Sequence, residues 1–343
     1  IQAVTAARPC CTIVVFRVRY AISKGETMCG IAGRTLNEPG HVGEDLTAMM
    51  AAQRHRGWDS TGFALYGTPR TTGYVVRALL DDRAHLDEDL EAIRAVTREH
   101  GADFVEEPTW DDSGQRHVTA RCVVSDPEPF SAWVDACDAL PRVELQSAGR
   151  ALEIVKDVGD ANEVADKHDV REFIGTHGLG HVRLATESNV SPVAGHPFWA
   201  RPFPDVAIVH NGQLTNYYTW RRKLQRRGYR FTTENDSELI AVWNSDRMAA
   251  GDSLRASLER SLSELDGVFT YLLATSDGIA LAKDRWAIKP VVAVLAPDGV
   301  AVATEEQSLR TLYQDEIDVE VCDGPSIVRV WPVASPVPAG AAA

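Results

Sequence analysis

The spacing of apolar residues predicts a succession of short strands and amphipathic helices, beginning near residue 29. A helix is expected over 42–54, because its apolar residues recur every three or four positions. A strand at 29–33 precedes this helix, and another at 63–66 follows it. The polar loop between the helix and the second strand, 54–62, contains two glycines, which are typical of a turn.

The middle of the chain predicts a separate small module. The expected elements are a strand at 74–80, a helix at 86–100, strands at 103–109 and 116–124 joined by a turn at Asp111–Gly114, a helix at 129–139 and strands near 143–155. The order strand-helix-strand-strand-helix-strand is typical of a ferredoxin-like βαββαβ unit. It contains no catalytic constellation, so we interpret it as an inserted structural or docking module over 76–169.

After residue 173 the pattern of the first segment resumes. Strands are expected at 173–185, 206–209, 267–275, 278–284, 290–295 and 299–304, and helices at 214–228, 236–250 and 253–264. Residues 29–75 and 170–331 are therefore predicted to form one α+β domain. The Pro/Ala-rich residues 332–343 are predicted to be a flexible tail.

Composition excludes several classes of function. The net charge of -14 and the pI near 5.2 argue against a nucleic-acid partner, because phosphate backbones select basic surfaces. The sequence has no run of about 18 apolar residues, so no membrane span is expected. One basic cluster, within residues 221–227, is interpreted as a solvated helix face.

The six cysteines show neither paired nor regular spacing, which argues against a zinc site or a disulfide framework. Free thiols suit a reducing cytoplasm, so we predict a cytoplasmic protein. Cys122, Cys137 and Cys322 are expected to be small buried hydrophobic residues.

The segment before Cys29 has two interpretations. The chain opens at Ile1, and its first methionine is Met28, directly before Cys29. Residues 1–28 are either upstream sequence, with synthesis starting at Met28, or a propeptide removed by processing. The first is favoured, because Lys24–Glu26 is compatible with a translated ribosome-binding stretch at a suitable distance. Under both interpretations the segment is absent from the mature protein.

A cysteine at a chain terminus is a self-sufficient nucleophile. Its own α-amino group, with an unperturbed pKa of about 7.7–8.0, is a suitable general base near neutral pH. Taken alone, however, Cys29 also fits a buried strand cysteine.

Five segments in order resemble the class-II glutamine amidotransferases, which are N-terminal-nucleophile hydrolases. They are Met28–Gly33, the loop Arg54–Gly62 with its Arg-Gly-x-Asp-Ser-x-Gly pattern, Gly180–Thr186 with Gly-His-x-Arg-x-x-Thr, Val209–Gly212 with His-Asn-Gly, and Thr233–Glu238 with Asp-Ser-Glu. The resemblance covers about 29–75 and 170–312. It implies a four-layer αββα sandwich of two antiparallel sheets, with the ferredoxin-like module inserted.

The resemblance also implies the catalytic roles. Cys29 matches the nucleophile that attacks the side-chain amide of L-glutamine. The Asn211 side chain and the Gly212 backbone N–H match the donors that hold the resulting oxyanion.

Further positions match the family's substrate-binding residues. Arg183 is implied as the partner of the substrate's α-carboxylate, with Thr186 adding a hydrogen bond, and Asp236 as the partner of its α-ammonium group. Arg56 is counted among the substrate-binding residues, and the resemblance implies that it braces the loop around the nucleophile. Asp59 and Ser60 are implied to form the turn of that loop.

A narrower resemblance concerns the whole assembly. After the arginine segment this chain has Thr186-Glu187-Ser188, where many members have His-Gly. This stretch and the segments that follow it resemble the glutaminase subunits of N-methylglutamate-synthase and glutamate-synthase-like complexes. The recognisable domain ends near residue 312, which leaves no room for an acceptor domain. We therefore expect a separate synthase subunit that carries FMN and an iron–sulfur cluster, with no cofactor or metal in this chain. The alternatives are a stand-alone γ-glutamyl amide hydrolase, or a non-catalytic regulatory subunit if the leader is retained.

Overall fold

The computed structural model describes residues 29–111, 117–184, 192–314 and 317–333. The predictions for the leader 1–28, for Thr186, for most of the 111–114 turn and for tail residues 334–343 lie outside these ranges. Within them, Pro332 is the last residue of a strand and not the first of a tail.

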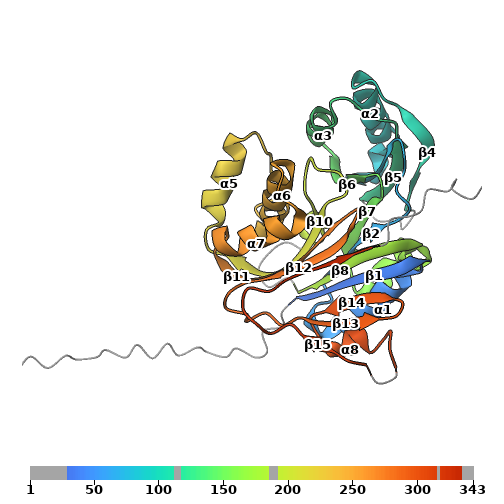
Figure 1. Ribbon diagram of the computed structural model, residues 1–343. Helices are drawn as coiled ribbons and strands as arrows, with labels where there is room; N and C mark the ends of the chain where they lie inside the picture. The colour runs from blue at the N-terminus through green and yellow to red at the C-terminus, as the bar shows by residue number, and fades with distance from the viewer. Residues whose placement is uncertain (1–28, 112–116, 185–191, 315–316, 334–343) are drawn as a thin grey trace, which may run out of the picture.

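Two antiparallel sheets form the centre of the molecule (Figure 1). The seven-stranded sheet has the order β15 (Glu320–Val321), β13 (Val292–Ala296), β14 (Gly299–Ala303), β1 (Gly30–Gly40), β8 (Gly175–Arg183), β2 (Ser60–Tyr66) and β7 (Leu152–Val158). The five-stranded sheet has the order β16 (Val328–Pro332), β12 (Gly278–Lys283), β11 (Gly267–Thr275), β10 (Ala207–Leu214) and β9 (Phe198–Trp199).

Helices cover the outer face of each sheet. Those packed on the seven-stranded sheet are α1 (Val42–Ala52), α4 (Ala161–Lys167) and α8 (Glu306–Leu309). Those packed on the five-stranded sheet are α5 (Tyr217–Arg226), α6 (Asp236–Ala249) and α7 (Leu254–Glu264), grouped together in Figure 1. The layers run helix, sheet, sheet, helix, which confirms the predicted αββα sandwich.

The alternation of side chains along β2 explains why both faces of this strand are apolar. Ala64 and Tyr66 point into the core between the sheets, whereas Phe63 and Leu65 point into the core under the outer helices. The Tyr66 hydroxyl lies 3.0 Å from the carbonyl oxygen of Ala274 in the other sheet and donates across the layer. A strand buried on both faces reads as continuously hydrophobic.

The inserted module has its own four-stranded sheet. Its elements are β3 (Tyr74–Leu80), α2 (Leu86–Glu99), β4 (Phe104–Trp110), β5 (Val118–Val124), α3 (Phe130–Asp138) and β6 (Val143–Gly149). The strand order β4-β5-β3-β6, antiparallel throughout, is that of a ferredoxin-like sheet, with β3 and β5 in the middle.

The predicted end of the module at residue 169 is wrong. β7 leaves the module's sheet and pairs with β2, from Ser60 opposite Val158 to Tyr66 opposite Leu152. The following helix, α4, packs in the core beside α1. The module's own sheet therefore ends at Gly149, because β7 finds its hydrogen-bonding partner in a strand far away in the sequence.

Several short elements have no counterpart in the sequence prediction, among them α4, α8, β9, β15 and β16. The three cysteines expected to be buried hydrophobic residues are indeed buried and free. Among the described residues no helix is both long and apolar enough to cross a membrane.

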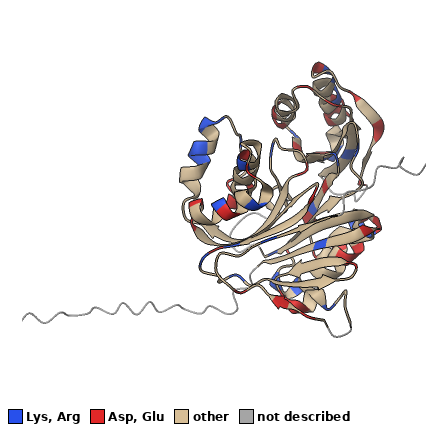
Figure 2. Ribbon diagram, in the orientation of Figure 1, with Lys and Arg blue, Asp and Glu red and all other residues tan. Residues whose placement is uncertain are grey.

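The basic cluster lies on α5 and just beyond it, where Figure 2 shows Lys and Arg along the helix. Arg222, Lys223 and Arg226 are exposed, as predicted for a solvated face. Arg221 differs, because its guanidinium donates to the carbonyl oxygen of Thr233 at 2.6 Å and lies over the Phe231 ring. This contact fixes the segment that leads into α6.

Candidate active site

Cys29 lies directly before β1, where the two sheets meet. Its carbonyl oxygen accepts a hydrogen bond from Asn211 Nδ2 at 3.0 Å and one from Arg56 Nε at 3.3 Å. Asn211 belongs to β10 of the five-stranded sheet, so these bonds tie the residue to both halves of the sandwich.

A cavity of about 260 Å³ opens beside Cys29. It is lined by Cys29, Leu184, His196, His210, Asn211, Gly212, Asn235, Asp236, Ser237 and Lys289. Cavities for drug-sized ligands usually measure about 300–1,000 Å³, so this one suits a smaller molecule. The structure thus brings together Cys29, Asn211, Gly212 and Asp236, which the sequence places up to two hundred residues apart.

Burial raises the pKa of the Cys29 thiol above its ordinary value. A hydrogen bond from the Leu184 backbone and the positive charges of Arg183 and Lys289 oppose that effect without cancelling it. A thiol in this environment needs a nearby base to become a nucleophile near neutral pH.

The backbone conformation at position 212 requires a glycine. Its φ of 139° is rarely adopted by residues with a side chain, and a Cβ atom there would lie 2.0 Å from the carbonyl oxygen of Val268 on β11. The glycine therefore allows β10 to pack closely against β11 next to Asn211.

Asp236 is the first residue of α6, and neighbouring donors hold its carboxylate. Its Oδ2 accepts from the Leu214 N–H at 2.8 Å, and its Oδ1 lies 3.5 Å from His210 Nδ1. Burial alone would raise the pKa of Asp236, but the charge and hydrogen bond of His210 outweigh it, so that the pKa is lowered. An ionised carboxylate at the start of a helix is also favoured by the helix dipole.

Behind the cavity, histidines surround the hydroxyl of Ser237. Ser237 Oγ lies 2.7 Å from His196 Nε2 and 2.8 Å from His210 Nδ1, and the ring of His181 stacks on that of His196. Burial lowers the pKa of His181 to about 3 and that of His196 well below its ordinary value, so both rings stay neutral. One hydroxyl proton can satisfy only one acceptor, so at least one of the two rings donates to Ser237 Oγ.

The predicted substrate residue Arg183 ends β8 and is not among the residues that line the cavity. Its Nη1 donates to the carbonyl oxygen of Ala194 at 3.2 Å, and its positive charge acts to lower the pKa of the Cys29 thiol. Lys156 Nζ donates to the carbonyl oxygens of Val193 and Gly195, which flank Ala194, at 3.3 and 3.2 Å. These two cations fix the segment that carries His196.

The loop after α1 supports the nucleophile from the other side. Arg56 forms an ion pair with Glu305 in addition to its bond to Cys29. The Asp59 N–H donates to the carbonyl oxygen of Arg183 at 3.1 Å, and Ser60 faces Arg183 across the β2–β8 pair. Arg56, Asp59 and Ser60 thus contact the backbone around the cavity rather than its interior.

Sequence reasoning assigned no role to His181, His196, His210, Ser237 or Lys289. His181, His210 and Ser237, but not His196, lie within two positions of predicted site residues, which was an available signal. Lys289 lies between two strands in a segment without any motif. Among the described residues no group of histidine, cysteine and carboxylate side chains is arranged to hold a metal ion.

Comparison with known proteins decides the family. Residues 181–311 match the model of a glutamine amidotransferase domain. A putative glutamine amidotransferase of Methanothermobacter thermautotrophicus is 36% identical over 313 residues, which cover 89% of this chain and 100% of the relative. The chain belongs to the class-II glutamine amidotransferases.

Other class-II glutamine amidotransferases and their structures agree. The glutamine amidotransferase-like protein GlxB of Rhizobium meliloti is 34% identical over 298 residues, 83% of this chain and 92% of that protein. The glutamine phosphoribosylpyrophosphate amidotransferase of B. subtilis shares the fold, with a TM-score of 0.54 at 16% identity over 89% of this chain. The matched part is 49% of that structure, so the amidotransferase chain described here spans about half of it.

Proposed function

We propose that the chain is the glutaminase subunit of a larger enzyme, hydrolysing L-glutamine at Cys29 and delivering the ammonia to a separate synthase subunit. The observation that carries this proposal is the convergence of Cys29, Asn211, Gly212 and Asp236 on one small cavity. A nucleophile, oxyanion donors and an anchoring carboxylate are the groups that hydrolysis of an amino-acid side-chain amide requires.

In the first half-reaction the Cys29 sulfur attacks the side-chain carbonyl carbon of glutamine. The resulting oxyanion is held by the Asn211 side-chain amide and the Gly212 backbone N–H. Collapse of this intermediate breaks the carbon–nitrogen bond and leaves a γ-glutamyl thioester. The thiol proton, carried by the base, is transferred to the leaving nitrogen, so that ammonia departs.

The proposed base is the α-amino group of Cys29 itself, exposed when residues 1–28 are absent. Burial raises the thiol pKa, which makes such a base necessary. In the second half-reaction the same amine activates water, which attacks the thioester carbonyl and releases glutamate with the free thiol.

Substrate orientation is assigned to one charge that lines the cavity, on Asp236, and to one on Arg183 outside its described lining. The ionised Asp236 would bind the α-ammonium group, and Arg183 the α-carboxylate, with Thr186 as an additional donor. Lys289 also lines the cavity, and we propose that its ammonium group stabilises the negative charge that develops near Cys29.

The separate synthase subunit is the part of the proposal that concerns the assembly. The Methanothermobacter thermautotrophicus relative, which is matched over its whole length, is named as a putative glutamine amidotransferase. We propose that the acceptor site, with FMN and an iron–sulfur cluster, lies on the partner. The buried free cysteines are consistent with a cytoplasmic complex.

Replacing the nucleophile tests the proposed activity. Cys29→Ala should lower kcat for glutamine hydrolysis by about 10³-fold or more, because Cys29 is the only cysteine among the described residues that line the cavity. Cys322→Ala is the matched control, because Cys322 is a buried cysteine directly after β15 and away from the cavity. This variant should keep its activity. Glutamine and other γ-glutamyl amides are assayed in parallel, since a preference for the latter would favour the stand-alone hydrolase. Full activity in Cys29→Ala would contradict the proposal.

A further inference from the structure

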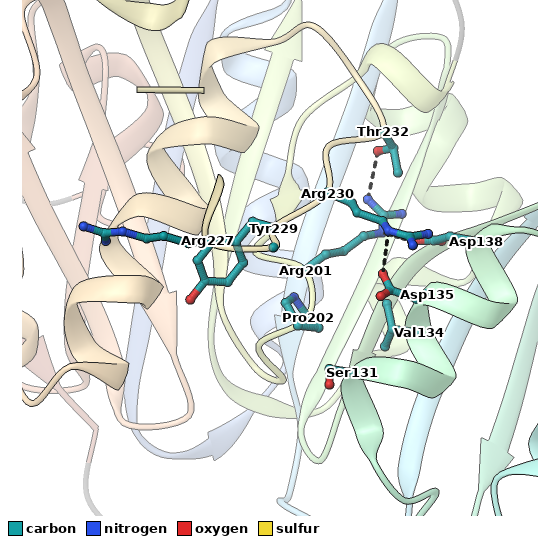
Figure 3. Close-up of a pocket in the computed structure, with 11 residues that line it drawn as sticks. Ser131, Val134, Asp135, Asp138, Arg201, Pro202, Arg227, Tyr229, Arg230 and Thr232 are labelled. Atoms are coloured by element: carbon teal, nitrogen blue, oxygen red, sulfur yellow. Dashed lines mark hydrogen bonds and ion pairs between the residues drawn. The ribbon is translucent and has the colours of Figure 1, made fainter. Parts of the chain in front are cut away.

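A second cavity, of about 240 Å³, lies between the inserted module and the main domain (Figure 3). One wall is α3 of the module, which contributes Asp135 and Asp138. The opposite wall is the β9–β10 connection with Arg201 and the segment before α6 with Arg230 and Thr232. Acidic groups therefore face basic groups across the opening.

Buried polar atoms in this cavity lack hydrogen bonds. Only 8% of the Arg201 side chain is exposed, yet its Nε and Nη2 have no hydrogen-bond partner, although Asp138 and Glu144 lie 3.3 and 3.9 Å away as ion pairs. Asp138 Oδ1 is also without a hydrogen bond. Buried donors and acceptors of this kind are normally satisfied by protein, water or a ligand, so these atoms offer pairing positions to a small polar molecule.

The charges restrict what that molecule can be. Arg201 already has carboxylates around it, Arg230 lies 3.7 Å from Asp135, and Arg227 is paired with Asp246. A dianion or a dication would therefore meet repulsion from one wall. Burial raises the pKa of Asp138 despite Arg201, which indicates a carboxylate that a further cation would stabilise.

An adjoining cavity of about 380 Å³ shares Asp138, Arg230 and Thr232 with the first. Its other lining residues are the apolar Ala139, Val143 and Phe231 and the acidic Glu144. The three apolar side chains of this compartment offer contacts to a hydrocarbon side chain next to the charged groups.

We propose that this crevice binds an α-amino acid with an apolar side chain. The ammonium group faces Asp135 and Asp138, the carboxylate faces Arg201 and Arg230, and the side chain enters the compartment beside Val143 and Phe231. Binding there is independent of the glutaminase activity proposed above.

The crevice is connected to the glutamine cavity by hydrogen bonds. Arg201 Nη1 donates to Thr232 Oγ1 at 3.1 Å, and Glu238 accepts from the backbone N–H groups of Thr232 and Thr233 at 2.9 Å each. Glu238 is fully buried in α6, two residues after Asp236. An occupant of the crevice would therefore contact the segment that positions the carboxylate of the glutamine cavity.

Calorimetric titration with L-leucine tests this site. The full chain is titrated alone and in the presence of excess L-glutamate, so that any binding in the glutamine cavity is recognised by competition. L-Valine and L-phenylalanine extend the panel. 4-Methylpentanoate, which is leucine without its ammonium group, and isopentylamine, which lacks the carboxylate, are the matched probes. At least one of the amino acids should bind at millimolar concentration or below, with both truncated probes at least about tenfold weaker.

Two exposed residues are replaced to locate the binding. Arg230→Ala and Asp135→Ala lie on opposite walls with side chains 71% and 46% exposed, so both variants should fold, and each should weaken binding at least about fivefold. Arg222→Ala, on the exposed face of α5, is the control and should bind as the unmodified chain does. No heat with any of the amino acids, equal binding of 4-methylpentanoate, or binding unchanged in both variants would overturn the proposal and leave a crevice filled by water.

Discussion

At the scale of single residues, the cavity holds the polar groups to which the proposed reaction assigns a role. Asn211 lies against the backbone of Cys29, while Asp236 is kept ionised by His210 and the Leu214 N–H. The neutral histidines behind them add hydrogen bonds without adding charge. Under the proposed mechanism, the Asn211 side would stabilise an oxyanion and the Asp236 side would bind an ammonium group.

Replacing Asn211 by alanine should remove one of two oxyanion donors. We predict a loss of about 10²–10³-fold in kcat with little change in KM, because the donor acts on the transition state. Steady-state glutaminase kinetics measure both parameters. Asn37→Ala, at an asparagine whose side chain binds only a backbone carbonyl at the surface, is the control. An unchanged kcat in Asn211→Ala would remove this residue from the mechanism.

The buried histidines make the fold sensitive to acid. The pKa of His181 falls to about 3 and that of His177 to about 4, mainly through burial, whereas both regain ordinary values near 6.5 on unfolding. Between those pKa values the unfolded chain binds protons that the native chain does not. Stability is therefore fully present above about pH 6.5 and is lost as the pH falls, by about 1.4 kcal/mol per pH unit for each histidine.

Removal of one such histidine should flatten this dependence. His181→Asn is predicted to reduce the slope of unfolding free energy against pH by about 1.4 kcal/mol per unit between about pH 5.5 and 4. Denaturant unfolding at a series of pH values provides the slope. His41→Asn, at an exposed position, should leave the slope unchanged, and an unaltered slope in His181→Asn would show that its ring titrates normally.

At the scale of elements, α6 begins with Asp236, which lines the cavity, and the first turn of this helix is fixed by side chains. Asn235 caps the helix by accepting from the Ser237 N–H at 2.9 Å, and Glu238 holds the backbone of the two preceding threonines. The position of Asp236 therefore depends on how well the helix begins.

Two helix caps allow the positional effect to be separated from stability. Asn235→Ala and Ser253→Ala each remove an N-cap, the second at α7 where Ser253 Oγ accepts from the Ala256 N–H. Each should cost about 1 kcal/mol of unfolding free energy. Only Asn235→Ala should also raise KM for glutamine. Equal KM values in the two variants would contradict a link between the α6 cap and substrate binding.

The sequence predicted most elements but not how all of them pair. The helix at 42–54 and the strand at 63–66 have strong local patterns and were found at nearly the observed positions. β7 was recognised as a strand, yet its pairing with β2 depends on a contact across ninety residues, which periodicity does not contain. β9 has only two residues, too few for any periodic signal.

The candidate site shows the same limit. Asn211, Gly212 and Asp236 were predicted because they belong to recognisable motifs, and each lines the cavity. Lys289 belongs to no motif, and only the packing of the β12–β13 connection against the sandwich brings it there. The Ser237 network required the distances between strands and α6, which the sequence does not supply.

At the scale of the whole molecule, the sandwich places Cys29 where its two sheets meet, and the inserted module adds a second cavity at its border with the main domain. The mechanism proposed for this cavity takes its base from the α-amino group of Cys29. The chemistry therefore depends on whether the chain that acts in the cell begins with this residue.

Mass spectrometry of the protein from its native source, after reaction with a glutamine-mimicking electrophile, tests this central claim most directly. We predict an intact mass that corresponds to a chain beginning at Cys29, carrying one covalent adduct that peptide mapping places on the Cys29 sulfur. A chain that retains residues before Cys29 and takes up no label would contradict the account.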